Sequence, residues 1–522
     1  MLNDKLYGDT LRRLDLLKIP YGSKQISISV YRNHSFEIIS NVINAFLSES
    51  NYKATFFFSD YDDSLNFSFR DADIQLIWID TNRYNKLIDL VSFFKERVGV
   101  LRSQTNAPIL IAYTGDNKLD LNDLTTDCFS LFVPDYINSF DNPYDLKKEP
   151  FSGTRLSSKA CLEVARVLGL RYIPAILDVP IKAIIVDLDN TLYEGILGED
   201  GVNKLIPNLD LQRQLKEYKS EGVFLCIASK NEENDVKKMF IERSDFVLHW
   251  DDFTTSQVNW NSKSDNIIKI AEILNIALDS ILFIDDNPAE IQNVEHLGIK
   301  TVLAKSNVSK IMKYYPGLLR LRKSNEDLIR SKDIQANIQR AKLFHTLSNE
   351  EYFEKLGIKL EYSINAKSQC KRISELLNKT NQFILSYIRY NESQVRNFIL
   401  LDPNNIVITI KMSDNLSDSG IIAICLATKK SENLFVKELV VSCRALGRHL
   451  EDIMLPYMLN IAKNKLNCSG YIDVAFKKGE RNQPAINWLS KYSSENLSDE
   501  GTVTFDCKNV SLKGLIIEVI DE

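Results

Sequence analysis

Lys182-Ala-Ile-Ile-Val-Asp187-Leu-Asp189-Asn-Thr191-Leu sets the architecture expected for the centre of this chain. The apolar run 183–186 has the pattern of a buried strand, and two aspartates follow it. Side chains alternate along a strand, so Asp187 and Asp189 can face the same space at its carboxyl end, where open α/β sheets bind ligands. Two close carboxylates repel each other unless a cation or a shared proton lies between them. The pattern therefore predicts a Mg²⁺ site in which Asp187 is the nucleophile and Asp189 transfers protons.

Two more apolar runs end in polar side chains of matching chemistry. The run 223–228 leads into Ser229-Lys230-Asn231, and the run 281–284 leads into Asp285-Asp286. Lys263 lies between them, just before a helical stretch. We expect one group of residues to bind phosphate: Thr191, Ser229, Lys230, Asn231 and Lys263. We expect a second group to bind the metal: Asp187, Asp189 through its backbone carbonyl, Asp285 and, directly or through water, Asp286.

The order DxDxT, Ser, Lys and DD along the chain resembles the haloacid-dehalogenase (HAD) phosphotransferases. The stretch from Asp187 to Gly201, with Glu194 and Gly195 within it, further resembles the FkbH-like family. Other blocks that resemble this family are 258–290, 377–383 and 442–448. Tyr193 and Glu194 stand where the family more often has Trp and Gly, which would suit a different acyl phosphate.

The resemblance implies a specific activity. Members of this family dephosphorylate 1,3-bisphosphoglycerate and deliver the glyceryl unit to the phosphopantetheine thiol of an acyl carrier protein. The expected function is therefore Mg²⁺-dependent dephosphorylation of a phosphorylated hydroxy acid with loading of the acyl unit onto a carrier. The alternative is a plain Mg²⁺ phosphatase of a small phosphorylated metabolite or sugar. The intact motifs argue against a non-catalytic interaction protein.

Bulk composition excludes several other classes of protein. The 522 residues suggest about three domains, and 44% hydrophobic with 26% charged residues is ordinary for a globular protein. The net charge of −6, without a basic stripe, does not predict a nucleic-acid partner. No apolar run approaches the length of a membrane span, and the eight cysteines form no CxxC pair. A reduced, cytoplasmic protein that is not bound to a membrane is the expectation.

The expected fold is α/β with three domains and a connector. Residues 1–178 alternate strand and helix patterns and resemble a degenerate SGNH-hydrolase domain, Rossmann-like in layout. No histidine lies between His34 and His249 to act as a late general base, so docking or scaffolding is favoured there. Residues 179–310 form the HAD core. Its inserts are too short for a folded cap, and 193–207 is expected to be only a flap, which leaves the site open to a protein-borne substrate.

Residues 311–348 are expected to form a helical connector, and 349–522 resemble an acetyltransferase-like (GNAT) α+β domain. Strands are expected at 400–412, 420–427 and 434–441, and a helix at 447–464. In the loop Arg444-Ala-Leu-Gly447-Arg448-His449, His449 replaces the glycine that a coenzyme A pyrophosphate needs. Recognition of a carrier-bound pantetheine through Arg444, Gly447 and Arg448 remains the expectation.

A cysteine thioester intermediate is left open by the sequence. Family members often have Cys immediately before the Ser of the second motif, but this chain has Ala228 there. Cys226 lies two residues back on the same face of the strand and is more often a core thiol in such a position. Cys443, beside the GNAT-like loop, is the other candidate.

Overall fold

The protein is described by a computed structural model that covers residues 4–8, 10–85, 88–121, 124–321, 336, 340, 349–442, 445–446, 450–494, 497–506 and 510–521. The chain forms two compact units. The first comprises residues 1–267 and 278–323, and the second comprises 268–277 and 324–522. The division of the chain into four segments remains a prediction. Within the described residues, no helix combines the length and the apolar character needed to cross a membrane.

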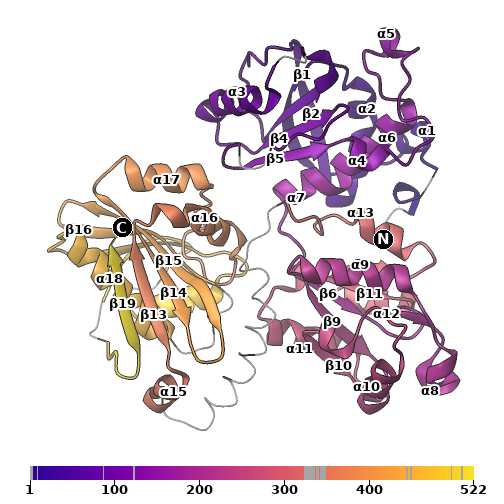
Figure 1. The fold of residues 1–522 in the computed structure, drawn as a ribbon. Coiled ribbons are helices and arrows are strands. Elements are labelled where there is room, and N and C mark those ends of the chain that lie inside the picture. Colours follow the sequence, from indigo (N-terminus) through magenta and orange to yellow (C-terminus); the bar gives the residue numbers. More distant parts are fainter. Residues whose placement is uncertain are drawn as a thin grey trace. The chain divides into compact units, whose positions relative to one another are not determined.

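The first unit begins with a five-stranded parallel sheet in the order β2-β1-β3-β4-β5 (Figure 1). Its strands are β1 (Lys24–Arg32), β2 (Tyr52–Tyr61), β3 (Ile74–Asp80), β4 (Ile109–Thr114) and β5 (Cys128–Phe132). Alternation along the strands separates two apolar faces. Trp78 and Leu110 pack on the side of α2 (Glu37–Leu47) and α6 (Ser158–Arg166), whereas Ile77 and Ile111 pack on the side of α3 (Leu90–Gln104). The predicted alternation of strands and helices is confirmed.

Two details of this sheet differ from the sequence-based expectation. The apolar spacing of residues 84–98 predicts a helix from Tyr84, but α3 begins at Leu90, because the Asp89 carboxylate caps it by accepting from the backbone N–H groups of Val91 and Ser92. Strand β5 was not predicted, since most of its five residues are half-buried and carry no clear alternation.

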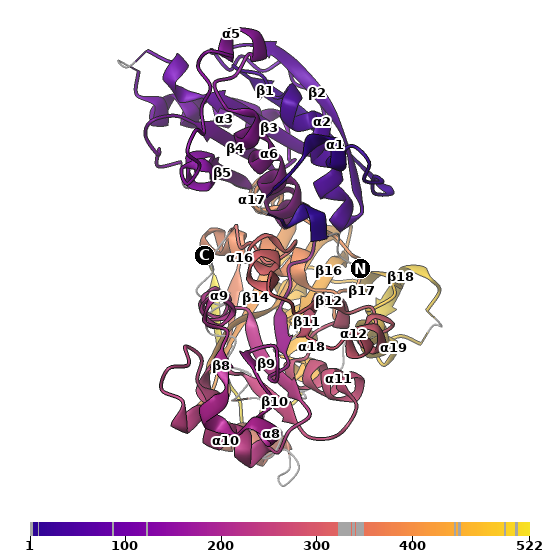
Figure 2. The same ribbon diagram turned by 90° about the vertical axis from the view of Figure 1, so that its right-hand side faces the viewer.

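The second sheet is also fully parallel, in the order β10-β9-β6-β11-β12 (Figures 1 and 2). Its strands are β6 (Ala183–Val186), β9 (Phe224–Ser229), β10 (Thr255–Val258), β11 (Ile281–Asp285) and β12 (Lys300–Leu303). The surrounding helices are α9 (Leu209–Ser220), α10 (Glu233–Glu242), α12 (Pro288–Glu295) and α13 (Val308–Tyr314). Helix α11 (Lys263–Leu274) begins in this unit, and its residues from Ile268 onward belong to the second unit. The sequence predicts a helix over 209–219 with Asn208 as its N-cap. This cap is confirmed, because the Asn208 side chain accepts from Leu211 N at 3.3 Å.

The insert after β6 is a small flap, as expected. Strand β7 (Tyr193–Glu194) pairs antiparallel with β8 (Ile206–Pro207), and the short helix α8 (Leu197–Asp200) lies between them. The second insert, between Ser229 and Lys263, holds only α10, β10 and one 3₁₀ turn, Trp250–Asp252. Neither insert forms a domain that could enclose the end of the sheet.

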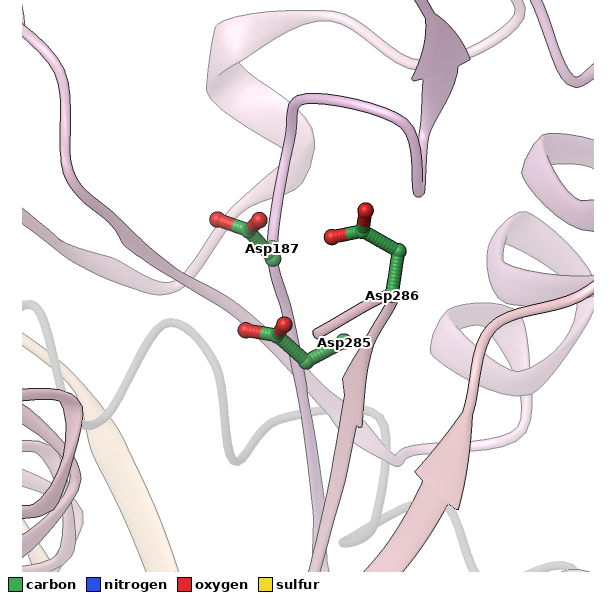
Figure 3. A group of neighbouring side chains, drawn as sticks. All are labelled: Asp187, Asp285 and Asp286. Carbon is green, nitrogen blue, oxygen red and sulfur yellow. The ribbon is translucent and has the colours of Figure 1, made fainter. Parts of the chain in front are cut away.

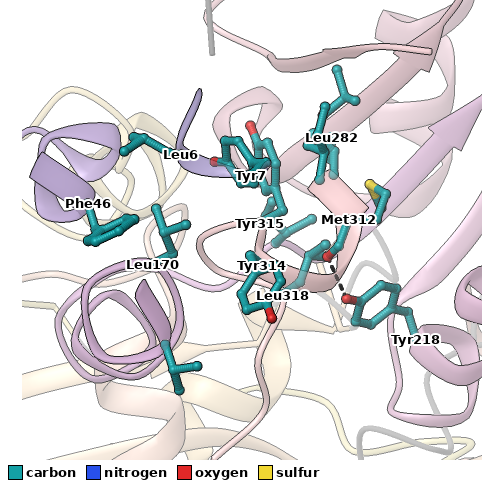
Figure 4. Packing of buried hydrophobic residues seen from close by; sticks show 14 of the residues in the cluster. Leu6, Tyr7, Phe46, Leu170, Tyr218, Leu282, Met312, Tyr314, Tyr315 and Leu318 are labelled. Carbon is teal, nitrogen blue, oxygen red and sulfur yellow. Dashed lines mark hydrogen bonds between the residues drawn. The ribbon is translucent and has the colours of Figure 1, made fainter. Parts of the chain in front are cut away.

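One hydrophobic cluster joins the two sheets of the first unit. Leu6, Phe46 and Leu170 from the first sheet's layer belong to the same buried cluster as Leu282 and Leu318 (Figure 4). Polar contacts reinforce this cluster. Tyr218 OH donates to Met312 O at 2.7 Å, and Tyr314 OH donates to Glu163 at 2.6 Å. Arg166 forms an ion pair with the same glutamate. The Tyr218 bond is the dashed line in Figure 4.

The second unit contains a seven-stranded mixed sheet in the order β18-β17-β16-β15-β14-β13-β19. The strands are β13 (Lys359–Ile364), β14 (Asn405–Ser413), β15 (Asp418–Lys430), β16 (Asn433–Val441), β17 (Ile472–Lys477), β18 (Glu500–Phe505) and β19 (Ile516–Asp521). The helices are α15 (Asn349–Leu356), α16 (Cys370–Lys379), α17 (Glu392–Leu400), α18 (Glu451–Lys465) and α19 (Gln483–Ser490).

Two boundaries in this unit correct the sequence-based expectation. The strand expected from Leu400 begins at Asn405, because Leu400 ends α17 and both it and Leu401 are exposed. The expected helix 447–464 is α18, which begins at Glu451. Strands β15 and β16 confirm the other two expected strands.

Candidate functional site

The three carboxylates expected at strand ends lie together. Strand β6 pairs with β9 on one side and β11 on the other, and Val186 is in register with both Ile227 and Ile284. Asp187 follows directly, and its backbone N–H donates to Ile284 O at 2.9 Å. One carboxylate oxygen from each of Asp187, Asp285 and Asp286 lies within 4.8 Å of the others (Figure 3). The parallel register therefore brings these groups to one point at the carboxyl edge of the sheet.

Lys263 is the positive charge in this cluster. It is the first residue of α11 and only 3% exposed. Its Nζ lies 2.5 Å from Asp187 Oδ1 and 3.1 Å from Asp285 Oδ2, and donates to Ala228 O at 2.7 Å. Burial opposes protonation of Lys263, but the two carboxylates outweigh it and raise its pKa. The ammonium predicted to bind phosphate thus also neutralises part of the carboxylate cluster.

The remaining negative charge makes the cluster suited to a cation. Burial, with a further contribution from Asp187, raises the pKa of Asp285 to about 6 although Lys263 acts in the opposite direction. Burial and the Asp187 charge also raise the pKa of Asp286. Asp285 Oδ2 is buried and receives no well-directed hydrogen bond from the described residues. Three hard oxygen ligands with one ammonium are a donor set that fits Mg²⁺.

The carboxylate of Asp189 is held by three donors. Tyr193 OH and Leu197 N donate to its Oδ1 at 2.6 and 3.1 Å, and Asn231 Nδ2 donates to its Oδ2 at 3.0 Å. The first two donors belong to the flap, and the third follows β9. The side chain of Asp189 is not one of the three clustered carboxylates, and its backbone carbonyl as a metal ligand remains a prediction.

The expected phosphate-binding residues divide into two groups. Ser229 is 1% exposed and accepts from Asn231 Nδ2 at 3.2 Å, while Thr191 Oγ1 is buried without a partner among the described residues. Lys230 instead forms an ion pair with Glu290 of α12 at 2.5 Å. Asn231 and Lys263 therefore contact the aspartates directly and Ser229 contacts Asn231, whereas Lys230 is turned toward α12, and phosphate binding by these residues and by Thr191 remains a prediction.

Two residues of the site were not predicted as functional. Tyr193 is fully buried, and burial together with the Asp189 charge raises its pKa strongly, so that it stays a neutral donor. Glu290 fixes Lys230. Tyr193 lies only four residues after Asp189 in the sequence, and this closeness could have suggested a contact between the two side chains. The contact itself depends on the hairpin of β7 and β8, which turns the Tyr193 hydroxyl back onto the Asp189 carboxylate.

Of the thiol and pantetheine candidates, Cys226 alone lies within the described residues. Cys226 is completely buried in β9, and burial raises the pKa of its thiol to about 12, as expected of a core cysteine. Cys443, Arg444, Gly447 and Arg448 lie outside the described residues.

His34, which follows β1, is the histidine that could be considered as a catalytic base in the region of the first sheet. It is buried, its Nδ1 lies 3.0 Å from Thr154 Oγ1, and its ring stacks on Trp78. Burial, with Arg83 and Arg155 nearby, lowers its pKa well below the usual value. The absence of esterase activity in this region remains a prediction.

Comparison with protein-family models gives no match, and comparison with curated proteins gives none. Among solved structures, the chain is similar to the N-terminal part of the protein BF1531 from Bacteroides fragilis, which contains a phosphatase domain complexed with Mg. The two sequences are 20% identical, the match covers 60% of this chain and 96% of that chain, and the TM-score is 0.44. It is also similar to 3-deoxy-D-manno-octulosonate 8-phosphate phosphatase from Moraxella catarrhalis, in complex with magnesium ion, phosphate ion and a KDO molecule. Here the sequences are 18% identical, the match covers 32% of this chain and 95% of that chain, and the TM-score is 0.20. At TM-scores below 0.5, these likenesses decide nothing about the chemistry of this chain.

Proposed function

We propose that this protein is a Mg²⁺-dependent phosphatase or phosphotransferase of the HAD type, with Asp187 as nucleophile. The observation that carries the proposal is the buried cluster of Asp187, Asp285 and Asp286 around Lys263. A cluster of this kind is unfavourable without a counter-ion. Asp187, Asp285 and Asp286 would hold the Mg²⁺, which would offset phosphate charge and orient the phosphoryl group.

The chain's own groups account for the two steps of the reaction. An oxygen of Asp187 attacks phosphorus, the bond from phosphorus to the leaving oxygen breaks, and Asp189 gives that oxygen a proton. In the second step Asp189 takes a proton from water, whose oxygen attacks the phosphorus of the aspartyl phosphate and releases Asp187. Ser229 and Thr191 donate to the phosphoryl oxygens, and the Lys263 ammonium balances their charge.

A phosphate-release assay tests this assignment. We expect Asp187→Asn to lose at least 99% of turnover on acetyl phosphate with Mg²⁺, because an amide oxygen is too weak a nucleophile. Asp210→Asn is the matched control, since Asp210 is an 80% exposed aspartate on α9 of the same unit. Retention of a tenth of the activity in Asp187→Asn, or full activity in EDTA, would refute the proposal.

The proposed function also includes an acyl substrate and a carrier protein that accepts the acyl unit. Among the described residues of the first unit, the inserts beside the site form no more than the flap and α10, so a long thin arm could reach it. On an acyl phosphate of a phosphorylated hydroxy acid, such as 1,3-bisphosphoglycerate, the carrier thiol would attack the acyl carbon, forming a C–S bond as the bond from that carbon to the phosphate oxygen breaks and phosphate leaves. Asp189 would accept the thiol proton, and the phosphate ester on the hydroxyl would be hydrolysed through Asp187. Direct attack by the carrier is favoured over a thioester on Cys226, because Cys226 is completely buried.

Intact-mass spectrometry separates the two candidate functions. Incubation with Mg²⁺, 1,3-bisphosphoglycerate and a holo-carrier protein should add a glyceryl mass to the carrier, and the apo-carrier, which lacks the thiol, should gain none. Phosphate release without any mass gain on the carrier would favour the plain phosphatase.

A further inference from the structure

A cavity of about 380 Å³ lies in the first unit, away from the carboxylate cluster. One side is formed by the start of β1 and the turn before β2. The other is formed by the segments that precede β6 and β11, the first residue of β12 and the segment after α13. Its charged lining residues are Lys24, Glu49, Asp178, Asp279 and Lys300. The Tyr315 ring, which packs beside Tyr7 and Leu282 in Figure 4, forms part of its wall. The volume is within the range of small-molecule sites.

The cavity is separate from the proposed catalytic site. Asp178 precedes β6 and Asp279 precedes β11, whereas Asp187 and Asp285 stand at the opposite ends of the same two strands. Four to five strand residues separate the two places, which corresponds to on the order of 15 Å. A ligand in the cavity would therefore not occupy the catalytic cluster.

Lys300 is the unusual member of the lining. Its side chain is largely buried, yet its ammonium makes no hydrogen bond and no ion pair with any described residue. Burial lowers the pKa of Lys300, and the Lys24 charge adds to this, while Asp178 and Asp279 act against it. A largely desolvated ammonium without a partner is unfavourable, so the cavity offers a charge that a ligand can satisfy.

The surrounding charges restrict what that ligand can be. Two lysines face three carboxylates, so a dianion such as a phosphate monoester would be repelled overall. Asp178 already accepts from Tyr52 OH at 2.6 Å and has further acceptor capacity. We propose that the cavity binds a small monocarboxylate that carries its own hydroxyl or ammonium donors, with its carboxylate on Lys300 and its donors toward Asp178 and Asp279.

Isothermal titration calorimetry on the full chain in EDTA tests this proposal with three probes: L-serine, D-glycerate and acetate. We expect serine or glycerate to bind at least ten-fold more tightly than acetate, because acetate has no donor for the carboxylates. Lys300→Met should weaken the better probe at least ten-fold. Lys310→Met, at an exposed lysine of α13, and Asp187→Asn should bind it like the wild type.

A second measurement guards against a folding defect. Because Lys300→Met removes an unpartnered ammonium, its thermal midpoint without ligand should equal or exceed that of the wild type. The proposal is overturned if none of the three probes binds, if acetate binds as tightly as serine and glycerate, or if Lys300→Met binds the better probe unchanged. It is also overturned if Asp187→Asn abolishes binding, which would place the probe in the catalytic site.

Discussion

Replacing Lys263 by methionine should separate the charge balance of the carboxylate cluster from its packing. The Nζ lies 2.5 Å from Asp187 and 3.1 Å from Asp285, and the side chain is 3% exposed. Methionine keeps most of the volume but leaves the carboxylates without their counter-charge. Removing one partner of a buried ion pair costs about 3–5 kcal/mol. We expect the metal-free first unit to lose about that much stability at pH 8.

The loss should shrink as the pH falls. The pKa of Asp285 is already raised to about 6, and removing Lys263, which acts to lower it, raises it further. Its folded-state pKa therefore lies well above the ordinary value, and the folded protein binds a proton that the unfolded chain releases. Protonation below pH 6 then relieves the repulsion, so Lys263→Met should be least destabilised at pH 5.5.

Metal binding should change in the opposite sense. Without the ammonium, three carboxylates attract Mg²⁺ more strongly, so the variant should bind Mg²⁺ more tightly while releasing phosphate more slowly. Urea unfolding in EDTA at pH 8 and 5.5, following the transition that Mg²⁺ shifts in the wild type, measures stability, and calorimetry measures the metal affinity. Lys204→Met, at an exposed lysine of the flap, is the control. A loss below about 1 kcal/mol at pH 8, or weaker Mg²⁺ binding, would refute the charge-balance reasoning.

Three further outcomes are expected. Tyr193→Phe removes one of the three hydrogen bonds to Asp189, and such a bond is worth about 1.5–3 kcal/mol for a charged acceptor. The value of kcat/KM for phosphate release should therefore fall about 10- to 100-fold, and an unchanged value would show that the flap does not position Asp189. Cys226→Ala should keep both phosphate release and carrier loading, and loss of loading alone in the folded variant would indicate an enzyme thioester. Burial raises the pKa of Glu438 from 4.5 to about 7, although four backbone N–H groups that donate to its carboxylate act to lower it. The folded chain therefore binds a proton that the unfolded chain releases, and the stability of the second unit should fall by about 3 kcal/mol from pH 4.5 to 7. Thermal unfolding of Glu438→Gln should lack this decline, and an equal decline in the variant would place its origin elsewhere.

The central sheet was predictable because its signals are local. Each candidate carboxylate or hydroxyl follows a short apolar run, as at Asp187, Ser229 and Asp285, and parallel strands bring such positions to one edge. Where local signals were weak, boundaries and strands were missed. Half-buried β5 has little alternation, and the start of β14 was displaced because the end of α17 is also apolar.

The sequence by itself determined the parallel α/β class of the centre, the residues that gather at its carboxyl edge and their candidate chemistry, since these follow from strand periodicity and residue type. Only the tertiary structure decided the partners of the long side chains. Lys263 lies between Asp187 and Asp285, Lys230 turns to Glu290, and Lys300 faces a cavity without a partner, although all three are simply lysines near strand ends in the sequence. A lysine has four rotatable bonds, so the packing of elements distant in sequence, and the burial it imposes, selects which charge its ammonium meets.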